Sequence, residues 1–423
     1  MRDIVLLLII GAGALAALRR PWIGALVWTW VSIMSPHAQF GYAASAWPVG
    51  MAVGVCTLIG FVLTPDKQNP FVDKPVWWML AFTVWICITL PFSFYFDGSF
   101  NLWLRSMKIF LMVFVTIALL NERRKIDAFI WVTVLSLGYY GVKGGVFTLA
   151  TGGNYRVWGP GGFIEGNNEI ALALVATIPL MRYLHLQLVV RWQRHAMMGA
   201  MLLTAVTVLG TYSRGALLAL SSMAFFLWLK GKNKIVFGVL TVAVGVAALS
   251  FMPEAWWSRM ETIKTYEKDD SALGRINAWW NAWNLAKSNP FGGGFMIYTK
   301  DVFARYAPEP DRVHAAHSIY FQVLGEHGFI GLFLFLAIGA STWMSCRKLI
   351  RMASRNPELR WAGELGSMVQ VGMIGYATGG AFLSLAYFDL PYNMMVAAVA
   401  VLKVVTTLVE RAAKQQAPLA MPT

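Results

Sequence analysis

One histidine in this sequence is placed where it could accept a proton from a hydroxyl group. His317 follows a long polar stretch, stands at the start of an apolar segment, and precedes Ser318 and Tyr320. A neutral imidazole in such a place can act as a general base, which typically accelerates a reaction by about 10²–10⁴-fold. His317 is therefore the catalytic candidate. The alternative is a histidine that only anchors the end of the apolar segment.

Basic side chains also occur at the ends of apolar segments, on the side of the chain that is otherwise poor in Lys and Arg. The arginines concerned are Arg105, Arg156, Arg214 and Arg275. A guanidinium group binds two phosphate oxygens at once through its planar fork. Several of them together predict a phosphate-bearing ligand, with a lipid diphosphate as the natural candidate. For any single arginine, a side chain that reaches towards lipid headgroups is the alternative.

Four further residues are secondary candidates, because they lie next to those named above in the sequence: His314, Arg312, Lys108 and Tyr320. His314 and His317 have a spacing that can ligate a metal, but no acidic third ligand adjoins them. The sequence also contains no phosphate-binding loop of the G-x-x-x-x-G-K-[ST] type. We therefore expect no metal site, no cofactor and no use of ATP by this chain.

The composition indicates an integral membrane protein. Of its 423 residues, 57% are hydrophobic and 13% are charged, whereas a soluble protein has roughly 25% charged residues. Long apolar runs without alternation predict transmembrane helices rather than barrel strands. The net charge of +14 comes mostly from short clusters between apolar runs, so nucleic acid is not an expected partner. The three cysteines lie inside apolar segments and predict neither disulfides nor a metal site.

The fold class predicted is an all-α polytopic membrane protein. The apolar segments cover residues 3–18, 21–35, 46–64, 76–95, 102–120, 127–150, 168–185, 196–212, 215–229, 235–252, 317–346, 366–388 and 391–409. Several are shorter than the roughly 20 residues that a crossing needs, and two could be half-spans, so we expect about 12 spans. Arg19 and Arg20 follow the first apolar run, which favours a retained first span over a cleaved signal peptide.

Charge asymmetry predicts the orientation of these spans. Most Lys and Arg clusters fall on one side, which should be cytoplasmic, and loops 36–45, 96–101, 151–167 and 253–316 should then face outwards. The expected organisation is a transmembrane bundle over 1–252, a long periplasmic loop over 253–316, helices over 317–410 and a cytoplasmic tail over 411–423. Within the long loop, apolar spacing predicts an amphipathic helix from Leu273 to Ala286.

Four motifs in order resemble the O-antigen ligase family. They are S-R-G at Ser213 to Gly215, L-G-R at Leu273 to Arg275, N-P-F-G-G-G at Asn289 to Gly294, and H-S-x-Y-x-Q-x-x-x-E-x-G at His317 to Gly328. More broadly, they resemble the module shared by O-antigen ligases, O-antigen polymerases and bacterial O-oligosaccharyltransferases. The opening R-R-P-W-I-G-A-L-V-W-T-W-V-S-I-M-S-P-H is similar to a subgroup described as O-glycosylation ligases.

The resemblance implies a GT-C-like glycosyltransferase of the bacterial inner membrane that acts in lipopolysaccharide biosynthesis. Such an enzyme transfers a finished glycan from undecaprenyl diphosphate to a sugar hydroxyl of lipid A–core on the periplasmic side, without metal or ATP. By motif, Arg214 and Arg275 would hold the diphosphate and His317 would be the general base. Arg156 and Arg105 match less distinct family positions. The implied partners are the lipid-linked glycan donor, the lipid A–core acceptor and membrane lipids.

Other functions stay open at this point. Within the same class, the protein could be an O-antigen polymerase or could glycosylate protein hydroxyl groups. From a different class, a lipid flippase or transporter could use the same arginines to hold a diphosphate. A transporter favours repeated halves and ionisable residues near the bilayer midplane. The sequence shows no repeat, and its candidate residues lie at the ends of segments.

Overall fold

The computed structural model describes residues 2–40, 47–231, 233–261 and 270–416, and every regular element in these ranges is a helix. The all-α prediction is therefore confirmed for this part of the chain. Some predicted features lie outside the described residues. They are residue 46 at the start of one apolar segment, parts of loops 36–45 and 253–316, and the end of the tail 411–423.

Each predicted apolar segment overlaps one of the longer helices. The helices are α1 Arg2–Arg19, α2 Pro21–Met34, α3 Pro36–Phe40, α4 Val49–Leu63, α5 Lys74–Thr89, α6 Phe96–Leu119, α7 Arg123–Ala150, α8 Asn167–Gln187, α9 Arg191–Gly210, α10 Arg214–Lys230, α11 Lys234–Ser250, α12 Glu254–Glu261, α13 Asp270–Ser288, α14 Lys300–Tyr306, α15 Ile319–Arg355, α16 Arg360–Gly380 and α17 Asp389–Gln416. Local signals explain several starts: Pro21 opens α2, and the Asp73 and Ser213 side chains cap α5 and α10.

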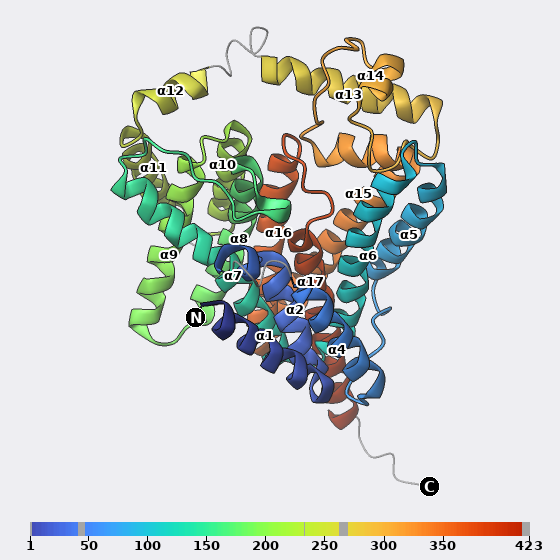
Figure 1. The fold of residues 1–423 in the computed structure, drawn as a ribbon. Helices are drawn as coiled ribbons and strands as arrows, with labels where there is room; N and C mark the ends of the chain where they lie inside the picture. Colours follow the sequence, from blue (N-terminus) through green and yellow to red (C-terminus); the bar gives the residue numbers. More distant parts are fainter. Residues whose placement is uncertain (1, 41–46, 232, 262–269, 417–423) are drawn as a thin grey trace.

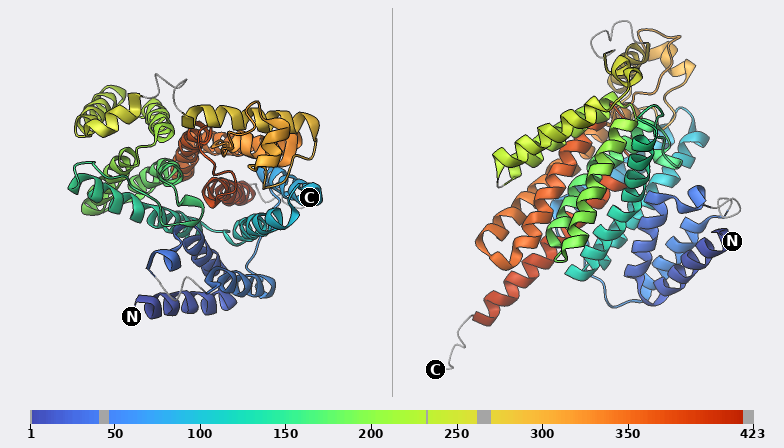
Figure 2. Two further views of the ribbon diagram at one scale, coloured as in Figure 1. Left: turned by 45° about the horizontal axis from the view of Figure 1, so that its top comes forward. Right: turned by 90° about the vertical axis from the view of Figure 1, so that its left-hand side faces the viewer.

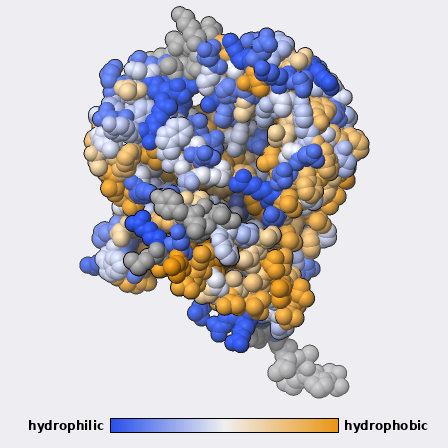
Figure 3. Space-filling model, viewed as in Figure 1, coloured by the Kyte–Doolittle hydropathy of each residue, from blue (hydrophilic) through white to orange (hydrophobic). Residues whose placement is uncertain are grey.

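Five of the described helices are long and apolar enough to cross a membrane, namely α5 with the short turn after it, α6, α8, α15 and α17. The number rises to six if α11 and α12, bent by 108° to each other, form one broken span, and α2 and α4 are shorter apolar helices. Apolar side chains cover much of the visible flank of the helices (Figure 3). The chain is thus a helical membrane protein, and the total of about 12 spans stays a prediction.

The helices form a main bundle with a smaller group at its side. In the main bundle α8 is surrounded by α7, α9, α10 and α16, and 83% of its most apolar stretch is buried. Helix α17 is also central, since its residues from Met394 to Val401 are all buried. Helices α1, α2 and α4 pack on one another at the side of the main bundle, which they join chiefly through α2 against α7 (Figure 2). The polar residues at the ends of α8 and α17 therefore belong to helices that are largely buried in the bundle.

Helices α12, α13 and α14 lie across one end of the bundle, which we call the capped end (Figure 1). The predicted helix Leu273–Ala286 is confirmed as the body of α13. It is fastened to the chain that leads into α15, because Trp279 Nε1 donates to the Ala316 carbonyl at 2.7 Å and its ring stacks on Phe321. Asn277 donates to the Glu309 and Arg312 carbonyls. The described part of the long loop is thus a fixed cover rather than a loose connection.

Two predicted segment boundaries are wrong. The segment 317–346 begins as a helix only at Ile319 and is interrupted at Gly328, whose φ of 70° is left-handed. The cause is the N-P-F-G-G-G loop, whose Gly293 and Gly294 amides donate to the Gly325 and Glu326 carbonyls, both at 3.0 Å. The segment 366–388 also loses its helix early, because α16 ends at Gly380 and turns lead from there into α17.

We expect Gly328→Ala to lower the free energy of unfolding by at least about 1–3 kcal/mol, because alanine is strained at a positive φ. Its Cβ would also overlap the Pro290 carbonyl oxygen. Thermal unfolding of the purified protein in detergent measures the effect. Gly339→Ala is the control, since it lies in the same helix with nothing within 4 Å of the new Cβ. Equal stability of the two variants would contradict the prediction.

Candidate active site

The backbone of His317 is held in an unusual conformation. Its φ of 42° is left-handed, and the other described non-glycine residues with this geometry are Ser35 and Tyr212. The Trp279 bond to the preceding carbonyl and the first turn of α15 that follows, where the Gln322 amide donates to the Ser318 carbonyl, restrain it on both sides. Left-handed backbone at a bulky residue is costly and often marks a functional site.

The surroundings of His317 favour its neutral form. Glu169 faces it from α8, with 3.9 Å between His317 Nδ1 and Glu169 Oε1, and the His314 ring lies 5.2 Å away between centroids. Burial lowers the pKa of His317 from its usual 6.5 to about 4, with further lowering by the charges of Arg275 and His314. At neutral pH the imidazole is therefore unprotonated and able to accept a proton.

Arg275 is brought to this cluster by α13. Its neighbour Gly274 lies directly against His314, where an added Cβ would sit 2.9 Å from the His314 ring, so the small residue allows the helix to approach closely. Arg275 is half-buried, and its charge acts on both His317 and Glu169. The structure thus joins a catalytic candidate with one of the predicted phosphate-binding arginines.

Arg214 is the first residue of α10, in a turn that is tied to other elements of the capped end. The Asn167 side chain at the start of α8 donates to the Thr211 carbonyl at 2.7 Å. Gly215 packs against Phe382, which lies in the turns between α16 and α17. The beginning of a helix favours an anion through its free amides and dipole. The position of Arg214 is therefore compatible with the predicted diphosphate contact.

Of the other two arginines, Arg156 lies in the loop of residues 151–166, and Arg105 lies on α6 and contacts that loop. Arg156 is exposed, with its guanidinium 5.4 Å from the centroid of the Tyr212 ring. The Arg105 guanidinium stacks 3.7 Å above the centroid of Phe163, and its charge interacts with Asp389, which accepts a hydrogen bond from Ser32. These contacts are with Tyr212, Phe163 and Asp389 rather than with His317, so the part of the two arginines in the same site stays a prediction.

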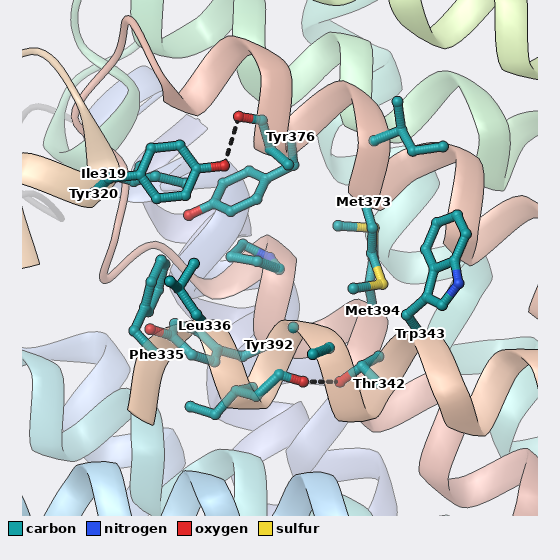
Figure 4. Close-up of a pocket in the computed structure, with 16 residues that line it drawn as sticks. Ile319, Tyr320, Phe335, Leu336, Thr342, Trp343, Met373, Tyr376, Tyr392 and Met394 are labelled. Carbon is teal, nitrogen blue, oxygen red and sulfur yellow. Dashed lines mark hydrogen bonds between the residues drawn. The ribbon is translucent and has the colours of Figure 1, made fainter. Parts of the chain in front are cut away.

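The secondary candidates have different surroundings. His314 belongs to the His317 cluster, whereas Arg312 forms ion pairs with Glu309 at 2.9 Å and Asp270 at 3.7 Å. Lys108 is exposed on α6. Tyr320 donates to the Ala377 carbonyl at 2.8 Å and lines an apolar cavity of about 350 Å³ between α15, α16 and α17. Figure 4 shows this cavity, whose wall includes Ile319 and Tyr320 at the start of α15.

Sequence reasoning missed Glu169, the only acidic side chain in the described chain within 4 Å of His317. Its signal was weak: an acidic residue at the start of an apolar segment, following the loop that contains Arg156. Asp389, the neighbour of Arg105, was missed for the same reason. The described residues also contain no group of three or more His, Cys, Asp or Glu that could hold a metal ion.

The fold and the cluster together define a helical membrane protein with a histidine, a carboxylate and arginine under a cover of short helices at one end. Residues 199–336 match the family model described as O-antigen ligase, and residues 1–188 match one described as Family of unknown function (DUF5935). No curated protein matches the chain. Residues 199–336 are thus similar to the O-antigen ligase family, whose members are ligase- or polymerase-type glycosyltransferases. The matched segment contains Arg214, Arg275 and His317.

Proposed function

We propose that this protein transfers a glycan from undecaprenyl diphosphate to a sugar hydroxyl of lipid A–core, at the periplasmic face of the bacterial inner membrane. The observation that carries the proposal is the cluster of a neutral His317 with Arg275, which α13 brings to it. The family match supports the reaction class. The apolar cavity lined in part by Ile319 and Tyr320 supports a substrate with a lipid tail, because its wall is almost wholly apolar.

In this reaction the acceptor oxygen attacks the anomeric carbon of the donor, and the bond from that carbon to the diphosphate oxygen breaks. His317 Nε2 takes the proton of the attacking hydroxyl. Arg275 and Arg214 stabilise the negative charge that the leaving diphosphate gains, as preformed charges do at other developing anions. Attack from the side opposite the leaving group inverts the anomeric carbon. The diphosphate is already a good leaving group, so no nucleotide has to be consumed.

The test uses the purified full-length protein in lipid vesicles with undecaprenyl-diphosphate-linked glycan. Lipid A–core, a second lipid-linked glycan and a hydroxyl-rich peptide are offered in parallel as acceptors. Attachment of the glycan to lipid A–core supports the proposed ligase. Glycan lengthening without core attachment would identify a polymerase, and peptide modification a protein glycosyltransferase. Movement of the lipid across the bilayer without any transfer would replace the proposal with a transporter.

The pH dependence of transfer should reflect the lowered pKa of His317. Below its pKa the ring is protonated and cannot act as a base, so kcat/KM should fall as the pH falls through about 4, and not around 6.5. Rates measured from pH 3.5 to 8 in vesicles give the profile. The remaining activity of His317→Ala should lack this acid limb. A wild-type limb centred near pH 6.5 would contradict the prediction.

A further inference from the structure

A carboxylate faces the nitrogen of His317 that the proposed reaction does not use. His317 Nδ1 is buried and has no hydrogen-bond partner among the described residues, and Glu169 Oε1 lies 3.9 Å from it. We infer that Glu169 is the positioning residue of the site, accepting a hydrogen bond from Nδ1–H of His317 when the diphosphate donor is bound. This inference rests on the proposed function. Catalytic hydrogen bonds are often long in a structure without substrate and shorten in the complex.

The other groups that face His317 cannot take this role. The charged and titratable neighbours in the described chain are Glu169 from α8, Arg275 from α13 and His314 from the same loop. A guanidinium has only donors and cannot accept a proton from Nδ1–H. His314 Nδ1 already lies 2.9 Å from the Ala315 carbonyl oxygen. Glu169 is therefore the acceptor that the geometry offers.

Glu169 is held firmly where it is needed. It lies in the first turn of α8, and its side chain is only 17% exposed. The carboxylate folds back over Gly166, where an added Cβ would overlap Oε2. Asn167 fastens the same turn to the Thr211 carbonyl, next to Arg214. A carboxylate fixed in this way orients a ring without losing much side-chain freedom when the substrates bind.

The contact would act on both the tautomer and the charge of His317. With the hydrogen on Nδ1, the Nε2 lone pair is free to accept the hydroxyl proton. The ring then becomes an imidazolium, which Glu169 stabilises without taking the proton itself, as in other histidine–carboxylate pairs. Arg275 opposes that positive charge in the free protein, and bound diphosphate would offset its effect. The carboxylate contribution should therefore be largest in the substrate complex.

The first test compares Glu169→Gln with Glu165→Gln, a matched control at an exposed carboxylate near the same turn. Glu169→Gln should lower kcat on the order of 10²-fold or more with little change in the donor KM. Its acid limb in kcat should also move to lower pH, which a purely structural role would not cause. Glu165→Gln should behave like wild type. A Glu169→Gln variant with wild-type kcat and acid limb would overturn the inference.

Gly166→Ala is a second variant that keeps every charged group. The new Cβ displaces the Glu169 carboxylate, while Gly166 has an ordinary φ of −71° that alanine adopts without strain. We expect a loss of kcat in the same direction as for Glu169→Gln but smaller. An unchanged kcat in a protein with wild-type thermal stability would also overturn the inference.

A measurement without turnover separates this inference from the proposed function. Nitrogen NMR of ¹⁵N-histidine-labelled protein in nanodiscs, with lipid-linked donor bound, no acceptor present and His317→Ala for assignment, reports the tautomer and pKa of His317. With Glu169 present, we expect the Nδ1–H tautomer, and Glu169→Gln should lower both its population and the pKa. This result would hold even if no glycan acceptor were found. A tautomer and pKa that do not respond to Glu169→Gln would refute the role of Glu169.

Discussion

Replacement of His317 by alanine should lower the rate of glycan transfer by about 10²–10⁴-fold, the usual contribution of a general base. The loss should fall on kcat, because the base acts as the hydroxyl attacks, while the donor is held by other groups. Single-turnover transfer and binding of lipid-linked donor, both in vesicles, separate the two steps.

His195→Ala is the control for this substitution, since His195 is exposed on α9 and away from the cluster. It should transfer glycan at the wild-type rate. If His317→Ala instead lost donor binding with an unchanged rate from the bound state, His317 would be a binding residue and the proposed chemistry would need another base.

Replacement of Arg275 by alanine should lower kcat/KM by about 10²–10³-fold, as the loss of one preformed donor to a developing anion does elsewhere. Arg275→Lys should lose less than alanine but should not restore the wild-type rate, because lysine keeps the charge and loses the planar fork. Transfer rates and donor affinity for both variants measure the effect. Arg305→Ala, at an exposed arginine of α14, is the matched control.

Arg275 also has an effect on its neighbour that tests the arrangement independently of diphosphate. Its charge lowers the pKa of His317, so Arg275→Ala should move the acid limb of kcat/KM from about 4 towards higher pH. An acid limb that does not move would show that the two side chains do not interact in the working protein. The direction is opposite to that expected in kcat for Glu169→Gln, so the two substitutions can be told apart.

Periodicity and composition predicted the helices because hydrophobic length and polar interruptions are local properties of the chain. Thus α13 and each apolar helix were predicted, and His317 was expected just before the beginning of α15. The break at Gly328 was not expected, because a glycine within an apolar run is compatible with a continuous helix. The break depends on the N-P-F-G-G-G loop, whose amides reach the α15 carbonyls only in the folded protein.

The candidate site was predictable only in part, because motifs are local in the sequence and tertiary contacts are not. Motifs identified His317 and Arg275, and the structure places them in one cluster. The pairing of His317 with Glu169 could not be read from the chain, because the two residues lie far apart in sequence and come together only in the folded protein. The contacts of Arg105 with Phe163 and Asp389 are of the same kind.

The bonds of the N-P-F-G-G-G loop also bear on the order in which the protein can be assembled during synthesis. The Gly293 carbonyl accepts from the Phe94 amide, ahead of α6, while the Gly293 and Gly294 amides donate to α15. The loop emerges from the ribosome before α15, so it has no partner on that side until the later helix is inserted. The cover can therefore be fastened only after the first part of α15 has been made, and a shorter growing chain would not yet have His317 and Arg275 assembled beneath it.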